Sequence, residues 1–447
     1  MNKDYGEQDG CRTGSSGASS LRRRRAVESC FSRHSNRTPK ALLLVGPTMT
    51  VAVVVAAGQG TRMRPLTERR PKPLLPAAGK SLLEHVLDTC ADHVDRYVVV
   101  VGYEGDQVRE TVGDEYAGSP VEYVTQDEQL GTAHAVEQAR EYVDERFLVL
   151  NGDVVIDPEL VADLAETEGS AMAVKPVADP RNYGVVALDG RRVTNVVEKP
   201  ADPPTDLANL GIYAFEPDAF AHVEATELSD RGEYEITESI QRYIDAGNDV
   251  TAVEYEGKWL DVGRPWELLE ANEYLLDGLE EDVRGTVEPR ATLDGAVVVE
   301  EGARVRNGAY IEGPVVVQSG ADVGPNAYVR GASVIGPDVR VGNAVEVKNS
   351  ILMADTACGH LSYVGDSVLG REVNFGAGTT VANLRHDDEC VRVRVKGESV
   401  DTGRRKFGVV VGDGTKTGID TSLNAGVKLG AGARTKPNET VTRDRME

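Results

Sequence analysis

The chain has 447 residues, of which 40% are hydrophobic, so it is too long for one ordinary domain and can form two cores. Its net charge is −24. Residues 1–48 contain nine basic and four acidic side chains, so the rest of the chain carries a net charge of about −29. This dispersed negative charge argues against a nucleic-acid partner and suits a salt-rich cytoplasm, while no apolar run is long enough to span a membrane. We therefore expect a cytoplasmic, halophilic protein without membrane contact.

The first 48 residues are rich in Ser, Gly and Arg and lack apolar periodicity, which predicts a disordered tail. The arginine run at 22–25 suits an anionic partner, but a solvated tail is favoured. An alternative is that Met49 is the biological start, because an apolar strand follows it at once. We favour this alternative.

The five cysteines are expected to be reduced thiols, because they form no C-x-x-C pair and no metal-ligand spacing. They are Cys11, Cys30, Cys90, Cys358 and Cys390.

Residues 49–280 alternate between strand and helix patterns. Strands are predicted at 50–57, 96–103 and 146–153, and helices at 82–94 and 133–143. This order indicates a Rossmann-like α/β domain with a largely parallel sheet. Ligands bind such sheets at the carboxyl ends of strands, where Gly58 and Asp153 lie.

The first strand runs into the segment "AAGQGTRMRPLTERRPKPLLP", which begins at Ala56 and contains two glycines and several cations. It is not a P-loop, because G-K-[ST] is absent, and Met63 replaces the third glycine of the dinucleotide motif. The backbone N–H groups of such a loop can hold a triphosphate while arginine and lysine neutralise it. The alternative is a purely structural turn.

Residues 281–447 repeat with a period of six. The repeated aliphatic positions are Val287, Leu293, Val299, Val305, Ile311, Val317, Val323, Val329, Ile335, Val341, Val347 and Met353. The pattern breaks at the start of 359–383, resumes at Leu369, Phe375 and Val381, and returns from Val411 to Leu429. A period of six predicts a parallel β-helix with three faces per coil, and the charged segment 384–408 is predicted to leave it.

The first domain resembles the sugar-1-phosphate nucleotidylyltransferases. Its matching motifs are the glycine loop, "QDEQLGTAHAV" (126–136), "NGD" (151–153), "NYGVV" (182–186), "VEKP" (197–200), "NLGIY" (209–213) and "WLDVG" (259–263). The resemblance implies that Arg62 and Lys72 act on phosphates and that Asp153 and Asp261 hold Mg²⁺. It implies nucleotide contacts at Ala56, Ala57, Gly58, Gly60, Gln126, Gly131 and Thr132, and sugar-phosphate contacts at Gly184, Glu198, Lys199 and Asn209.

The second domain resembles the acetyltransferase half of bifunctional UDP-N-acetylglucosamine pyrophosphorylase/glucosamine-1-phosphate acetyltransferases. The matching segment is "GNAVEVKN…GHLSYVGD…NFGAG". This resemblance implies a left-handed β-helix, a trimer or a multiple of it, and His360 as the base that takes a proton from the amine. It also implies sugar-phosphate contacts at Arg330, Lys348, Tyr363 and Asn374, and acetyl-CoA contacts at Ala377, Asn383 and Lys406.

Two features differ from the bacterial pattern. In the bacterial pattern, Asn-Tyr is followed closely by a lysine. Here Leu384 follows Asn383, and the candidate Lys406 comes only after the insertion 385–405. The glycine-loop signature is also closer to that of the thymidylyltransferases. The nucleotide substrate can therefore be either UTP or dTTP. We predict a bifunctional enzyme that acetylates glucosamine-1-phosphate and then transfers a uridylyl group to the product. The rivals are a nucleotidylyltransferase whose β-helix is only a scaffold, and a sugar-nucleotide-binding regulator.

Overall fold

The computed structural model describes residues 51–446. The predicted tail at 1–48, with Cys11, Cys30 and the proposed start at Met49, lies outside the described residues. Cys90, Cys358 and Cys390 are free thiols, as predicted. Among the described residues, no helix is both long and apolar enough to cross a membrane.

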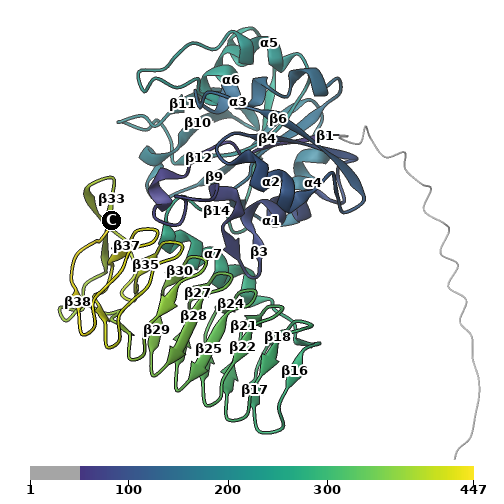
Figure 1. The fold of residues 1–447 in the computed structure, drawn as a ribbon. Coiled ribbons are helices and arrows are strands. Elements are labelled where there is room, and N and C mark those ends of the chain that lie inside the picture. Colours follow the sequence, from purple (N-terminus) through teal and green to yellow (C-terminus); the bar gives the residue numbers. More distant parts are fainter. Residues whose placement is uncertain (1–50, 447) are drawn as a thin grey trace, which may run out of the picture. The chain divides into compact units, whose positions relative to one another are not determined.

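The first part of the described chain is a ten-stranded sheet (Figure 1). Its strands are, in spatial order, β10 (Gly184–Asp189), β11 (Arg192–Glu198), β13 (Val250–Glu254), β9 (Ser170–Pro176), β12 (Leu207–Phe215), β7 (Phe147–Asn151), β1 (Val51–Val55), β4 (Arg96–Val101), β6 (Ser119–Thr125) and β5 (Glu115–Tyr116). Strand β1 pairs in parallel with β4 and β7, and β4 pairs in parallel with β6. Strand β12 runs antiparallel to both β7 and β9.

The prediction of a largely parallel sheet is therefore correct: β9 and β13 also pair in parallel, and only β5, β11 and β12 run antiparallel to the strands beside them. Between 184 and 215 no α-helix connects the strands, so β10, β11 and β12 follow one another by short reversals. The predicted elements are all present but shorter: β4 ends at Val101 and β7 at Asn151, and the helix expected at 133–143 is split after Glu137.

Helices cover both faces of this sheet. One face packs against α1 (Leu82–Cys90), α2 (Gly105–Val112) and α4 (Pro158–Glu166). The other packs against α3 (Thr132–Glu137), α5 (Ala219–Glu224) and α6 (Ile236–Asp245). Residues of β1 pack alternately into the hydrophobic cores on the two faces of the sheet, because successive side chains of a strand point to opposite faces. A seventh helix, α7 (Pro265–Asp277), leads into the second part of the chain.

The second part is a parallel β-helix of three sheets (Figure 1). Sheet 1 contains β15 (Asp282–Val283), β18 (Val297–Val299), β21 (Val315–Val317), β24 (Ser333–Ile335), β27 (Ile351–Leu352), β30 (Val368–Leu369), β35 (Val410–Val411) and β37 (Lys428–Leu429). Sheet 2 contains β16 (Thr286–Val287), β19 (Arg304–Val305), β22 (Asp322–Val323), β25 (Arg340–Asn343), β28 (Ala357–His360) and β31 (Asn374–Phe375). Sheet 3 contains β17 (Thr292–Asp294), β20 (Tyr310–Glu312), β23 (Tyr328–Arg330), β26 (Glu346–Lys348), β29 (Tyr363–Gly365), β32 (Thr380–Val381), β36 (Ser422–Leu423) and β38 (Thr440–Val441).

The repeated aliphatic residues form the core of this β-helix, with one exception. Leu352 takes the inward position predicted for Met353, because Ile335 pairs with Leu352. Met353 instead faces the α/β part, where its Sδ accepts a hydrogen bond from Arg70 Nη1 at 3.0 Å.

The register change arises at the corner between sheets 3 and 1, not near His360. The steps from Val347 to Leu352 and from Val364 to Leu369 are one residue short, whereas both steps around Cys358 are regular. Buried serines close the shortened corners: Ser350 Oγ accepts from Ser367 N at 3.0 Å and donates to the Lys348 carbonyl at 2.8 Å. The sequence prediction that the register breaks at the start of 359–383 is thus wrong in position.

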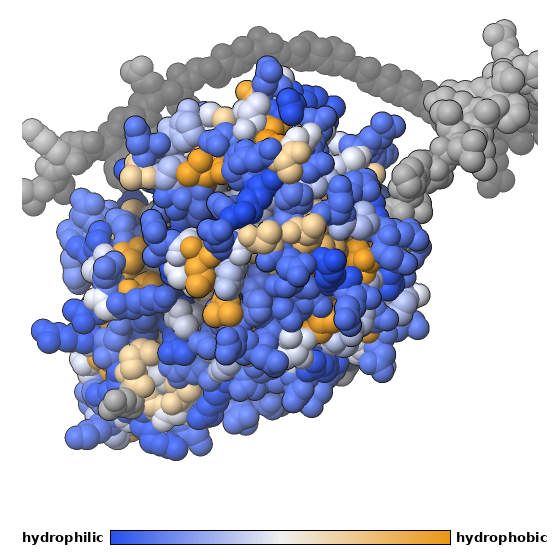
Figure 2. All heavy atoms as spheres, turned by 90° about the horizontal axis from the view of Figure 1, so that it is seen from above, coloured by the Kyte–Doolittle hydropathy of each residue, from blue (hydrophilic) through white to orange (hydrophobic). Residues whose placement is uncertain are grey.

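The predicted excursion is a hairpin of β33 (Arg392–Val395) and β34 (Glu398–Asp401). It leaves and re-enters the β-helix at one point, because Leu384 pairs with Lys406 and Phe407 N donates to the Asn383 carbonyl at 3.0 Å. Val391, Val393 and Val395 are buried, so the hairpin packs against the protein. Figure 2 shows a largely hydrophilic face with only small, separate hydrophobic groups, in keeping with the acidic composition.

Candidate active sites

The glycine loop leaves β1 at the carboxyl edge of the sheet. Ala56 and Ala57 are buried, and Ala56 N donates to the Val100 carbonyl at 2.8 Å. Gly60 has φ of +60°, and a Cβ there would lie 2.7 Å from the Cβ of Lys72. A Cβ at Gly58 would meet nothing within 4 Å. The loop is therefore tightly fixed at Gly60, with open space at Gly58 for the approach of a phosphate.

The two predicted metal ligands meet beside this loop. Asp153 follows β7, and β8 (Val154–Val155) pairs with β14 (Leu260–Asp261) so that Asp261 lies opposite Val154. Val262 N donates to the Asp153 carbonyl at 3.2 Å and fixes the pairing. The buried Lys72 forms an ion pair with Asp153, and its Nζ lies 4.0 Å from Asp261 Oδ1. Residues more than 100 positions apart are thus brought together.

The carboxylates of Asp153 and Asp261 fit a magnesium ion that also binds phosphate. Burial raises the pKa of Asp153, while the charge of Lys72 opposes this shift. The described residues hold no cluster of three or more metal-binding side chains, so most ligands of an ion here would be phosphate and water oxygens, as Mg²⁺ prefers. Arg62 is also close, since a Cβ at Gly263 would lie 3.0 Å from its Nη2.

Three of the predicted nucleotide-binding residues, Gln126, Gly131 and Thr132, form one hydrogen-bonded loop. Gln126 Nε2 donates to the Gly131 carbonyl at 3.1 Å and lies 3.1 Å from His134 Nδ1. Thr132 Oγ1 accepts from Ile236 N at 3.1 Å, and Ala133 N donates to the Tyr234 carbonyl at 2.9 Å. The segment around Tyr234 therefore supports this loop from behind.

Gly131→Ala is expected to disturb this loop. Gly131 has φ of +119°, and an added Cβ would lie 2.6 Å from the backbone nitrogen of Tyr234. The backbone strain is worth about 1–3 kcal/mol. We expect a lower free energy of unfolding and a raised KM for the nucleotide, measured by urea titration and initial rates. Gly118→Ala is the control, because it carries similar backbone strain at a φ of +87° while its Cβ would touch nothing within 4 Å; an equal rise of KM in both variants would contradict the assignment.

Three predicted sugar-phosphate residues also converge. Gly184 pairs with Glu198 across β10 and β11, and a Cβ at Gly184 would lie 3.3 Å from Glu198 Oε2 and 3.4 Å from Asn209 Cβ. Asn209 Nδ2 donates to Tyr213 Oη at 2.7 Å. The fourth residue, Lys199, lies at the rim with Nζ 3.1 Å from Glu198 Oε1. All four predicted residues therefore belong to one site.

The sequence did not reveal Thr237 and Arg231 as members of this site. Thr237 Oγ1 donates to Glu198 Oε2 at 3.2 Å, and Arg231 Nη1 donates to Glu198 Oε1 and to Glu235 Oε1, both at 3.0 Å. These residues come from α6 and the loop before it, 33 or more positions from Glu198. No local motif marks them, so only the fold could reveal them.

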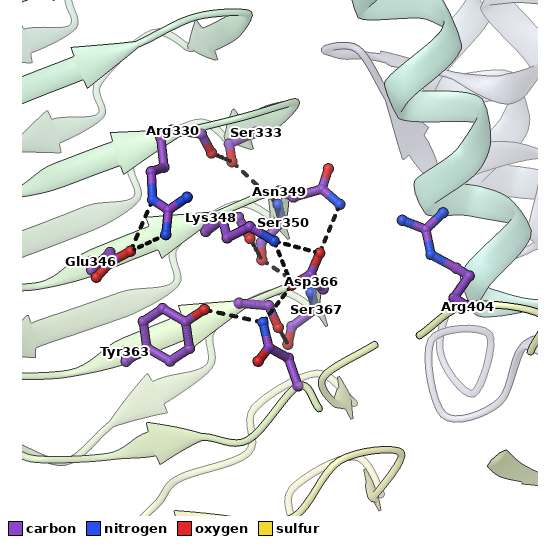
Figure 3. A network of polar contacts seen from close by, with 12 residues as sticks. Arg330, Ser333, Glu346, Lys348, Asn349, Ser350, Tyr363, Asp366, Ser367 and Arg404 are labelled. Carbon is purple, nitrogen blue, oxygen red and sulfur yellow. Dashed lines mark hydrogen bonds and ion pairs between the residues drawn. The ribbon is translucent and has the colours of Figure 1, made fainter. Parts of the chain in front are cut away.

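A second group of predicted residues lies on sheet 3 of the β-helix (Figure 3). Arg330 and Lys348 are direct neighbours on β23 and β26, and Tyr363 begins the next strand, β29. Arg330 donates to Glu346 Oε1 from Nε at 3.0 Å and from Nη2 at 2.8 Å. Two cations and a phenol thus share one face.

Asp366 organises this face and was not predicted. Its carboxylate, 2% exposed, accepts from Lys348 Nζ at 2.8 and 2.9 Å and from Asn349 Nδ2 at 3.0 Å (Figure 3). It also accepts from Asn383 Nδ2 at 2.5 Å, and that same amide donates to Tyr363 Oη at 3.1 Å. One buried carboxylate therefore links residues predicted for the sugar phosphate and for acetyl-CoA.

Asp366→Ala is expected to destabilise the protein by about 3 kcal/mol, because it leaves the partly buried Lys348 ammonium without its partner. Acetyl transfer should fall with it. Thermal unfolding of the full chain measures the first effect and CoA release the second. Asp387→Ala in the exposed insertion is the control. An unchanged melting temperature would show that Asp366 contributes no net stability.

The other predicted acetyltransferase residues lie on sheet 2 and its corner with sheet 3. His360 ends β28 and is exposed; its carbonyl accepts from Ser362 Oγ at 2.9 Å and Gly378 N at 3.2 Å. Asn374 starts the next strand of sheet 2, and Ala377 lies at the following corner. Asn374 is therefore not on the face that carries Arg330, Lys348 and Tyr363.

The insertion brings Lys406 to the site despite its distance in sequence. Lys406 pairs with Leu384, the residue that follows Asn383. Lys406 and Leu384 line one surface pocket together with Asp366. Arg404 Nη1 donates to Glu273 Oε2 of α7 at 3.1 Å, and Asn349 Nδ2 donates to Glu273 Oε1 at 2.7 Å. A helix of the α/β part thus anchors the end of the insertion beside Lys406.

An α/β sheet whose edge gathers a glycine loop, cations and two aspartates defines a nucleotidyltransferase, here joined to a β-helix. The Nucleotidyl transferase family matches residues 51–278, and the family of GMPPB C-terminal domains matches residues 311–407.

Named relatives cover most of the chain. The "Bifunctional protein GlmU" of Methanocaldococcus jannaschii is 44% identical over 85% of this chain and 92% of that protein. The "Bifunctional sugar-1-phosphate nucleotidylyltransferase/acetyltransferase" of Sulfurisphaera tokodaii is 37% identical over 88% and 97%. The "Low-salt glycan biosynthesis nucleotidyltransferase Agl11" of Haloferax volcanii is 36% identical over 73% and 93%. The chain belongs to the family of these bifunctional GlmU-type nucleotidylyltransferase/acetyltransferases.

Proposed function

We propose that this enzyme makes UDP-N-acetylglucosamine in two reactions. The β-helix acetylates glucosamine-1-phosphate with acetyl-CoA, and the α/β domain then joins the product to UMP from UTP with release of pyrophosphate. The observation that carries this proposal is the presence of two separate groups of charged residues, one around Asp153 and the other around Asp366. A nucleotidylyltransferase with an inert scaffold would need only the first.

In the first domain, the chain's own residues hold and neutralise two anions that repel each other. The Gly58 side of the loop receives the triphosphate, Lys72 and Arg62 compensate its charge, and Glu198 and Asn209 orient the sugar. A magnesium ion on Asp153 and Asp261 would stabilise the charge of the transferred phosphoryl group. The sugar phosphate oxygen forms the new P–O bond, and pyrophosphate leaves with the electrons of the broken one.

In the second domain, an amine attacks the thioester carbonyl, and the C–S bond breaks to release CoA. His360 takes the proton that the amine must lose. Arg330, Lys348 and Tyr363 would bind the sugar phosphate, and Ala377, Asn383 and Lys406 would face acetyl-CoA. The large exposed side chains of Leu361 and Ile419 lie at the same corner as His360, which suits a site covered by substrate or another subunit.

We further propose a homotrimer of left-handed β-helices, with domains at 49–280 and 281–447, in a salt-rich cytoplasm. The positions of the site residues support the trimer. Asn374 lies on sheet 2, whereas Arg330 and Lys348 lie on sheet 3. A single site that contains all three would therefore need residues from two neighbouring subunits. Light scattering of the purified chain tests the trimer, and a monomer with full acetyltransferase activity would contradict it.

The substrate assignment is tested by measuring products with UTP and dTTP against glucosamine-1-phosphate, N-acetylglucosamine-1-phosphate and glucose-1-phosphate. We expect the highest kcat/KM for UTP with N-acetylglucosamine-1-phosphate. A preference for dTTP with glucose-1-phosphate and no CoA release would favour a thymidylyltransferase with a β-helix scaffold.

A further inference from the structure

A pocket rich in basic side chains lies where the insertion hairpin meets the last coils of the β-helix. It is lined by Arg394, Gly397, Lys428, Asp444, Arg445 and Met446. Arg394 and Gly397 come from the hairpin, and the others come from β37 and the chain that follows it. Three basic residues and one acidic residue are unusual in a chain of net charge −24. None of these residues belongs to either candidate active site.

Lys428 points to a missing partner in this pocket. The residue is 8% exposed, yet its ammonium makes no hydrogen bond or ion pair within residues 51–446. Its backbone N–H donates to Asp444 Oδ1 at 2.9 Å, so this carboxylate is partly engaged. Burial lowers the pKa of Lys428, and Asp444 and Glu68 oppose this shift without forming an ion pair with it. The stem of the side chain is buried while its ammonium still reaches solvent at the pocket, where a bound anion can accept hydrogen bonds from it.

The other two cations line the pocket from different parts of the chain. The Arg394 side chain, on the hairpin, makes no hydrogen bond or ion pair with any residue that the structure describes. Arg445 is held by Glu439, whose Oε2 accepts from its Nη1 at 3.2 Å, and its Nη1 also donates to the Arg434 carbonyl at 2.7 Å. The pocket thus combines one fixed guanidinium with two cations that lack partners.

We propose that this pocket is a binding site for a phosphate group carried by a small molecule. Arg394, Lys428 and Arg445 would donate charge-assisted hydrogen bonds to its oxygens, a geometry in which arginine and lysine bind phosphate well. The site is separate from both candidate active sites.

Phosphate binding would fasten the hairpin to the β-helix. The hairpin already packs there through Val391 and Val393, and the Arg392 carbonyl lies against Gly426. A phosphate bound by Arg394 of the hairpin and by Lys428 and Arg445 of the last coils would add a link between these two parts. Because the same insertion carries Lys406 to the acetyl-CoA side, a phosphorylated ligand would also support that site; this consequence alone rests on the proposed function.

The test is titration of the full chain with inorganic phosphate and, separately, pyrophosphate, against chloride at equal ionic strength. Hydrogen exchange of residues 385–405 and thermal unfolding are the readouts. We expect phosphate to slow exchange in the hairpin, and the double variant Arg394→Gln/Lys428→Gln to raise the apparent Kd on the order of tenfold or more. Stronger protection by pyrophosphate than by phosphate would identify a diphosphate ligand. Equal protection by the two anions would identify a single phosphate group.

Lys436→Gln is the matched control, since it removes an exposed lysine from the same end of the β-helix, and it should respond like the unmodified chain. Arg394→Gln alone changes only an exposed side chain, so it must weaken binding without altering the fold. The proposal is overturned if the double variant keeps the original affinity, or if chloride protects the hairpin as well as phosphate does.

Discussion

Asp153→Asn is expected to lower the rate of pyrophosphate release by about 10²-fold or more, because the charge stabilisation supplied by a magnesium ion is worth several kcal/mol. Asp153 lies at the end of β7, with Asp261 beside it and Lys72 paired to it. Loss of the negative charge weakens metal binding and also leaves the buried Lys72 without its ion pair. The measurement is the initial rate of pyrophosphate formation at several magnesium concentrations.

The same variant should keep its acetyltransferase activity, because Asp366 and its partners lie on the β-helix. Asp189→Asn, at the exposed end of β10, is the matched control and should keep both activities. Pyrophosphate release by Asp153→Asn at the normal rate and magnesium dependence would remove Asp153 from the metal site. Loss of both activities would indicate misfolding instead, which thermal unfolding would reveal.

His360→Ala is expected to reduce acetyl transfer by about 10²–10⁴-fold, the usual effect of losing a general base. Nucleotidyl transfer should stay near normal, since no residue of the first site lies on the β-helix. The imidazole is exposed at the corner between sheets 2 and 3, where an amine could reach it. CoA release with glucosamine-1-phosphate is the measurement. His386→Ala, an exposed histidine of the insertion, is the control and should be fully active.

A pH series separates a base from a merely structural histidine. A protonated imidazole cannot accept a proton, so acetyl transfer by the unmodified chain should decline in acid. His360→Gln keeps the size and polarity of the side chain but should not restore activity. If His360→Gln acetylates at the normal rate throughout the series, His360 is not the base.

The fold was largely predictable because both of its patterns are strong. A buried strand followed by a glycine loop predicted β1, and the period of six predicted the β-helix core from Val299 to Leu429. The prediction failed at Met353, because the corner between Val347 and Leu352 is one residue short; the corner between Val364 and Leu369 is shortened in the same way. Serines close these corners through hydrogen bonds between coils, and a serine in sequence does not reveal such a bond.

The first site was predictable to the extent that its residues lie in recognisable motifs. Asp153, Asp261 and Lys72 meet as expected, and so do Gly184, Glu198 and Asn209. Arg231 and Thr237 were missed because they reach the site from α6 and its preceding loop. Such contacts depend on tertiary packing rather than on local spacing.

The second site was predicted less completely. Asp366 looks like an ordinary Gly-Asp turn in the sequence, and only its burial beside Lys348 reveals its role. Lys406 appeared displaced by the insertion, but the hairpin closes on itself and returns the lysine to Leu384. An insertion that leaves and re-enters at one point changes the spacing in sequence without changing the position in space.

The most direct test supplies the purified chain with glucosamine-1-phosphate, acetyl-CoA, UTP and magnesium, and follows CoA, pyrophosphate and the nucleotide sugar by mass spectrometry. We predict UDP-N-acetylglucosamine, with one CoA and one pyrophosphate released for each molecule formed. Nucleotide-sugar formation from these substrates without release of CoA would contradict the proposal that one chain performs both reactions.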